Sequence, residues 1–116
     1  MLKTADYQVG NRGVQDAARR RRALAHVIKV SFPQSWRDSL GEDYLRHWGE
    51  ASTWVRVERL VSTIRHLHNQ AVKRHRKGKN GDQREAIRHY REDLAWLREK
   101  LMPKEPPFKW PTMMSL

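Results

Sequence analysis

The sequence predicts an all-α protein, a small helical bundle built on a long antiparallel helical hairpin. Apolar residues recur every three or four positions over most of the chain, which is the spacing of one helical face. No segment alternates apolar and polar residues over the length that a half-buried strand needs. At 116 residues the chain suits one domain with a modest hydrophobic core.

The first predicted element is a helix over residues 14–30, which follows an N-terminal loop over residues 1–13. Gly13 suits the loop, and Pro33 favours an end near residue 30 because the residue before proline avoids the helical region. The apolar residues on one side of this helix are Val14, Ala17, Ala18, Leu24, Val27 and Ile28.

Residues 32–52 are rich in aromatic side chains and predict one or two short helices. The break is expected near Gly41 and the end near Gly49, because glycine weakens a helix. We interpret this segment as a plug in the core, around which the other helices pack. Its large apolar residues are Phe32, Trp36, Leu40, Tyr44, Leu45 and Trp48.

The hairpin is predicted from two amphipathic helices at about 53–76 and 82–102. Asp82 followed by Glu85 is a variant of the capping box that begins helices. A connection of about five residues between long helices favours an antiparallel pair. Pro103 ends the second helix, so the helical domain is expected over 14–102 and an extended, proline-rich tail over 103–116. The apolar stripe of the first helix is Trp54, Val57, Leu60, Val61, Ile64, Leu67 and Ala71. The seam of the second is Ile87, Tyr90, Leu94, Leu97 and Leu101.

Composition excludes several classes of protein. The chain has no cysteine, so it forms no disulfide and no thiolate metal site. No apolar run approaches the ~20 residues of a membrane span, and residues 1–13 lack the apolar core of a signal peptide. We therefore expect a cytoplasmic or nucleoid-associated protein with no membrane partner.

A strong excess of basic residues is the most informative feature. The chain has 24 Lys and Arg against 13 Asp and Glu, for a net charge of +11 and an isoelectric point of about 10.7. Residues 1–30 carry a net charge of +5 and residues 53–81 carry +7, whereas residues 31–52 carry −2. Such a concentrated positive charge predicts attraction to a polyanion.

Two basic clusters are candidate binding sites for phosphate. Consecutive residues of a helix point in directions about 100° apart, so Arg19–Arg22 cannot share one face. We expect Arg21 at the edge of the core, and Arg19, Arg20 and Arg22 free to bind phosphates. The second cluster surrounds a helix end and a glycine-containing turn, where like charges repel and a phosphate backbone would relieve that repulsion. Its members are Lys73, Arg74, Arg76, Lys77 and Lys79, and Arg56 and Arg59 extend the basic surface.

The sequence therefore predicts a DNA- or RNA-binding protein that contacts the phosphate backbone and needs no cofactor or metal. Its size and helical character are similar to those of the helical small subunits of RNA-guided defence complexes. Whether the chain acts alone or as a small subunit of such a larger nucleoprotein complex stays open at this point. No phosphate-cradling glycine loop and no nucleophile constellation is present, so an enzyme is not expected.

Several other hypotheses remain open. The chain could be an adaptor or inhibitor with an acidic protein partner, contacted through Trp96, Phe108 and Trp110, and the last helix could form a homodimer. A helix-turn-helix unit could occupy residues 36–63, with Arg56, Arg59 and Thr63 facing outward.

The spacing of Arg59 and His66 resembles that of HEPN ribonucleases, which implies metal-independent RNA cleavage. His89 and Asp93 are four residues apart and could share a metal, but the sequence offers no third ligand.

Overall fold

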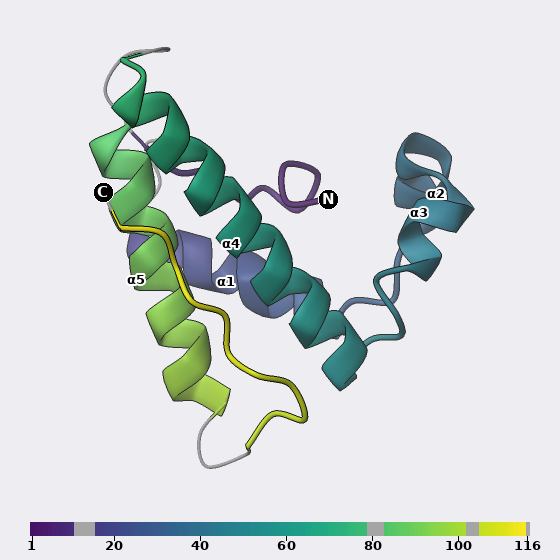
Figure 1. Cartoon of the computed structure of the whole chain (residues 1–116). Coiled ribbons are helices and arrows are strands. Elements are labelled where there is room, and N and C mark those ends of the chain that lie inside the picture. The colour runs from purple at the N-terminus through teal and green to yellow at the C-terminus, as the bar shows by residue number, and fades with distance from the viewer. Residues whose placement is uncertain (11–15, 79–82, 102–104, 116) are drawn as a thin grey trace.

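Five α-helices make up the regular structure of the chain (Figure 1). The computed structural model describes residues 1–10, 16–78, 83–101 and 105–115, and these ranges contain no strand. The predicted all-α bundle is thus confirmed. The helices are α1 (Ala17–Lys29), α2 (Gln34–Leu40), α3 (Glu42–Arg46), α4 (Trp54–Arg76) and α5 (Arg84–Leu101).

The long helices α4 and α5 lie side by side and run in opposite directions, and α1 crosses both of them (Figure 1). α4 begins at a capping residue, since the Thr53 side chain accepts a hydrogen bond from the Arg56 backbone N–H at 3.3 Å. The predicted capping residue of α5, Asp82, lies outside the described residues, as does Val14 before α1.

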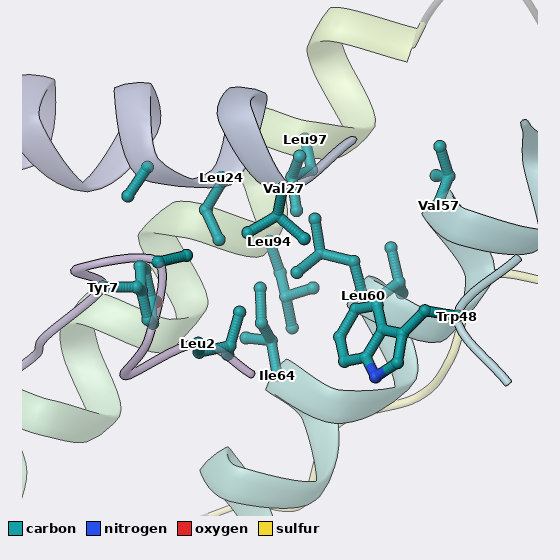
Figure 2. Packing of buried hydrophobic residues seen from close by; sticks show 13 residues of the cluster. Leu2, Tyr7, Leu24, Val27, Trp48, Val57, Leu60, Ile64, Leu94 and Leu97 are labelled. Carbon is teal, nitrogen blue, oxygen red and sulfur yellow. The ribbon is translucent and has the colours of Figure 1, made fainter. Parts of the chain in front are cut away.

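The core forms where the apolar stripes of α1, α4 and α5 meet (Figure 2). Leu24 and Val27 of α1 pack with Leu60 and Ile64 of α4 and Leu97 of α5, and all five side chains are fully buried. Full burial of such a side chain contributes about 1.5–3 kcal/mol to folding, so this packing is the main source of stability.

The first ten residues take part in the core, which the sequence did not predict. They form turns rather than a helix, yet Leu2, Ala5 and Tyr7 are buried against the bundle. Figure 2 shows Leu2 and Tyr7 facing the same apolar cluster as Leu24 and Ile64. The segment 1–10 therefore closes a side of the core that the helices alone leave open.

The aromatic segment does not plug the core, so that expectation was wrong. α2 and α3 pack against each other and stand to one side of the bundle (Figure 1). Trp48 alone among its large apolar residues is buried in the central cluster, while Tyr44 is 37% exposed. The reason is geometric: Gly41 has a φ of 91° and interrupts the segment, which leaves helices too short to span the bundle.

The tail lies on the helical hairpin as an extended chain (Figure 1). Phe108, Trp110 and Met113 are half-buried against the core cluster, and Met114 packs near Ala71 and Val72. Among the described residues, no helix is long and apolar enough to cross a membrane.

Candidate nucleic-acid interface

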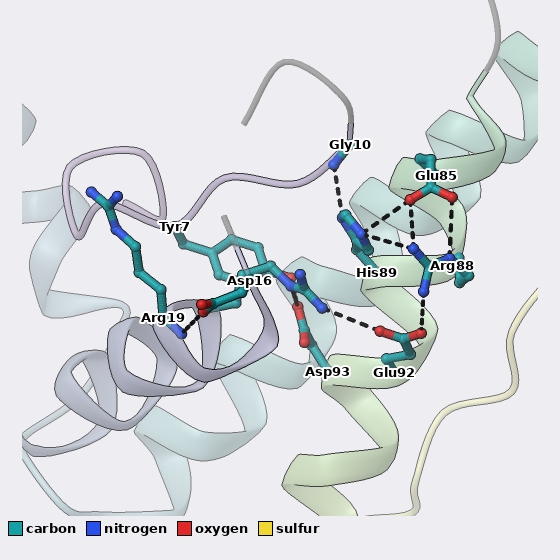
Figure 3. A network of polar contacts seen from close by, with 10 residues as sticks. Tyr7, Gly10, Asp16, Arg19, Glu85, Arg88, His89, Glu92 and Asp93 are labelled. Carbon is teal, nitrogen blue, oxygen red and sulfur yellow. Dashed lines mark hydrogen bonds and ion pairs between the residues drawn. The ribbon is translucent and has the colours of Figure 1, made fainter. Parts of the chain in front are cut away.

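Arg20 is buried, so its predicted role as a phosphate contact is wrong. Its side chain is 2% exposed, its Nε donates to Asp93 Oδ2 at 2.9 Å, and its Nη2 donates to Glu92 at 3.3 Å. The Tyr7 hydroxyl donates to the same Asp93 oxygen at 2.6 Å (Figure 3). Arg20 is four residues before Leu24 and seven before Val27, so it lies on the inward stripe of α1.

This polar network attaches the N-terminal segment to α1 and α5. The Gly10 backbone N–H donates to His89 Nδ1 at 2.9 Å, and burial lowers the pKa of His89 (Figure 3). Burial and the adjoining Asp93 carboxylate raise the pKa of Tyr7, which keeps its hydroxyl a donor. His89 and Asp93 are thus engaged separately, and the described residues hold no group of three metal-ligating side chains.

Arg56 is also buried, which corrects a second predicted phosphate contact. It is 2% exposed and donates to backbone carbonyls of Val27, Val30 and Gly49, each at 2.8 Å. Its guanidinium carbon lies 4.0 Å from the centre of the Phe32 ring. Arg56 therefore joins the end of α1 to the loop before α4. It cannot face a DNA groove as the helix-turn-helix hypothesis requires.

Three arginines of the first cluster remain on the surface of α1. Arg19 is exposed and pairs with Asp6 at 2.8 Å, a contact in which both side chains are more than half exposed. The Arg21 guanidinium lies 5.7 Å from the centre of the Trp96 ring and the residue is exposed, so Arg20 and not Arg21 is the arginine of this cluster that reaches the core. Arg22 is exposed and forms no ion pair with a described residue.

The second cluster provides the densest exposed positive charge. Lys73, Arg74 and Lys77 are exposed at the C-terminal end of α4, and none of them forms an ion pair with a residue that the structure describes. Arg76 is exposed as well, but it donates to the Ser115 backbone carbonyl. Lys79 lies outside the described residues.

The exposed charge continues along α4 toward its start. Arg59, His66 and Lys73 are all exposed, and their seven-residue spacing places them on one face of the helix. Glu58 is the sole carboxylate within α4. We call Arg59, His66, Lys73, Arg74 and Lys77 the α4 basic face.

α5 presents a different surface, in which several charges are neutralised. Arg88 donates to Glu85 and Glu92 at 2.5 and 2.7 Å, and these hydrogen bonds raise its pKa. Arg91 donates to His68 Nε2 at 2.9 Å, and the neighbouring carboxylate Asp93 is bound by Arg20. Sequence spacing alone did not reveal this contact between α4 and α5.

The three aromatic residues predicted to bind a partner are engaged within the chain. Trp96 is half-buried between Arg21 and Lys100, whose Nζ lies 4.8 Å from its ring centre. Phe108 stacks on Trp110 with a centroid distance of 6.3 Å. Their role as partner contacts stays a prediction.

No family model matches the chain, and no curated protein or solved structure matches it either. The surface of the chain itself is therefore the basis for assigning a function.

Proposed function

We propose that this protein binds nucleic acid through the phosphate backbone, with the α4 basic face as its main contact. The main support for the proposal is a set of four exposed cations on this face, none of which forms an ion pair with a described residue. They are Arg59, Lys73, Arg74 and Lys77. Unneutralised cations in a chain of net charge +11 attract polyanions and release counterions on binding them.

Helix stability gives a partial alternative reason for the charge. Cations in the last turn of a helix interact favourably with its dipole, by about 0.3–1 kcal/mol each. This accounts for basic residues near Arg76, where α4 ends. It does not account for Arg59 or His66, because the dipole acts only within the terminal turns.

Arg19 and Arg22 on α1 extend the proposed contact surface, and Arg20 and Arg56 do not belong to it. Lysine and arginine side chains on an exposed helix face bind phosphates with little dependence on base sequence. We therefore expect weak sequence preference and a steep loss of affinity with rising salt.

The test is a salt series of binding to labelled single- and double-stranded DNA and RNA. Changing Lys73, Arg74 and Lys77 to glutamine removes three phosphate contacts. The slope of log affinity against log salt should become shallower by about 2–3, since each contact contributes roughly 0.7–0.9.

The matched control changes Arg37, Arg46 and Lys3 to glutamine, which removes the same charge from exposed positions outside the α4 basic face and the tail. An equal loss in both variants would show that net charge acts without a located site. Absence of binding to all four nucleic acids at low salt would refute the proposal.

A further inference from the structure

Three arginines form a row along α5. Arg84, Arg91 and Arg98 are exposed and are spaced seven residues apart, so they lie on one face of the helix.

The chain's own tail lies along this row. The Met114 carbonyl accepts from Arg91 Nη2 at 3.1 Å, and the Arg98 guanidinium lies 5.8 Å from the centre of the Trp110 ring. Arg76, at the end of α4, donates to the Ser115 carbonyl. The Met114 backbone N–H donates to Asn69 Oδ1 at 3.2 Å. A hollow of ≈ 410 Å³ remains between α5 and the tail.

Among the residues that the structure describes, the partners of the cations in contact with the tail are neutral. Arg76, Arg91 and Arg98 form no ion pair with a described residue; they contact carbonyl oxygens, an imidazole and an aromatic ring. A phosphate oxygen is negatively charged and phosphate can accept two parallel N–H bonds from one guanidinium, whereas a backbone carbonyl is neutral. Phosphate oxygens are therefore better acceptors for these side chains than the tail carbonyls.

Arg91 is held in place for such a contact by a buried group. His68 is fully buried, and its Nε2 accepts from Arg91 Nε at 2.9 Å. This contact fixes the guanidinium so that Nη2 points to the tail. His68 Nδ1 in turn lies 2.9 Å from Asn69 Oδ1, the atom that also binds the Met114 N–H.

We propose that Arg76, Arg91 and Arg98 form a second phosphate-binding surface, which takes a single nucleic-acid strand when the tail leaves it. The tail and the strand exclude each other, so the tail limits binding until a strand displaces it. This inference rests on the proposed function and adds that the nucleic-acid ligand is an unpaired strand.

The form of the occupied site favours a single strand. The present occupant is one extended chain with aromatic side chains: Trp110 lies over Arg98, Phe108 stacks on Trp110, and Phe108 meets the Trp54 ring in a T-shaped contact at a centroid distance of 6.3 Å. Departure of the tail removes Phe108 from the Trp54 ring. Aromatic rings beside cations are the usual platform for unpaired bases.

A reversible disulfide between the tail and α4 tests the proposal in the full chain. The chain has no cysteine, so Asn69→Cys with Met114→Cys introduces the one pair that can form a disulfide. The oxidised and reduced forms are then compared with labelled oligothymidylate in a salt series, after a thiol assay has verified each state. The reduced form should bind more tightly. Its salt slope should be steeper by about two, because three more cations reach the strand.

A second variant tests the role of the tail without the engineered disulfide. Changing Phe108 and Trp110 to alanine weakens the attachment of the tail, and the affinity for oligothymidylate should rise severalfold. Thr112→Ala, at an exposed position of the same tail, is the matched control and should leave the affinity unchanged. Circular dichroism verifies that each variant keeps its helices.

The outcomes separate the two proposals. Equal affinity and slope in the oxidised, reduced and Phe108/Trp110 variants would overturn the role of the tail and leave the proposed function standing. If release of the tail raises the affinity for polyglutamate but not for oligothymidylate, the arginine row binds acidic peptides, and the nucleic-acid assignment is overturned. Failure of every form to bind any oligonucleotide would overturn both proposals.

Discussion

The four consecutive arginines of α1 have different environments because a helix turns by about 100° at each residue. Arg20 points inward and forms a buried ion pair with Asp93, whereas Arg22, two residues later, is exposed. The sequence predicted that the four differ, but it placed Arg21 rather than Arg20 at the edge of the core. The spacing from Arg20 to Leu24 and Val27 was the signal that one of them lies on the buried stripe.

Arg20→Gln should therefore lower the free energy of unfolding by about 3–5 kcal/mol, because it leaves the Asp93 charge buried and without its partner. Arg22→Gln should change it by less than about 0.5 kcal/mol, as expected for a surface position. Urea denaturation of the two variants makes the comparison. A similar stability for both would contradict the buried ion pair.

Arg56 shows why such roles are difficult to predict from sequence. Its outward-facing position was inferred from α4 alone. In the structure the acceptors come from α1 and the preceding loop, which fold over that side of the helix. When other segments cover the first turn of a helix, fewer of its residues are exposed than the apolar pattern of that helix predicts.

At the scale of elements, α4 and α5 are joined by polar contacts as well as by their apolar stripes. His68 of α4 is buried and accepts a hydrogen bond from Arg91 of α5, which requires an unprotonated Nε2. Burial and the Arg91 charge lower the pKa of His68, although its hydrogen bond to Asn69 acts in the opposite direction.

This arrangement predicts a pH dependence of stability. His68 binds a proton less readily in the folded chain than in the unfolded chain, where its pKa has the ordinary value of about 6.5. Below that pH the unfolded state binds more protons, so the free energy of unfolding should fall as the pH decreases from about 7 to 5.

Denaturation of the native chain and of His68→Gln across this pH range tests the prediction. The glutamine variant should lose part of the pH dependence and keep the part that comes from His89, whose pKa burial also lowers. An unchanged pH profile in His68→Gln would show that His68 does not titrate with unfolding.

At the scale of the whole molecule, both ends of the chain pack on the helical bundle. Tyr7 and Asp93 are 86 residues apart in sequence and share a buried hydrogen bond, and Leu2 lies in the same core as Leu97. The N-terminal segment is joined to α1 and α5 through Asp93, which binds both Tyr7 and Arg20, and the tail contacts Arg91 and Arg98 of α5.

Leu2→Ala should cost about 2–5 kcal/mol of stability, the range for truncation of a buried leucine, although the residue lies next to the chain start. Lys3→Ala, at the exposed neighbouring position, should have an effect below about 0.5 kcal/mol. Thermal denaturation of both variants tests this prediction. An equally small effect in Leu2→Ala would mean that the segment 1–10 is not part of the cooperative core.

The sequence by itself determined the all-α class, the breaks near Gly41 and Gly49, and the helical hairpin, because periodicity and helix-breaking residues act locally. It also determined that the second basic cluster lies at a helix end. The tertiary structure decided which arginines are buried, where α2 and α3 stand, and that both chain ends cover the bundle. Apart from the helical spacing that places Arg20 on the stripe of Leu24 and Val27, these features depend on contacts between residues far apart in the sequence.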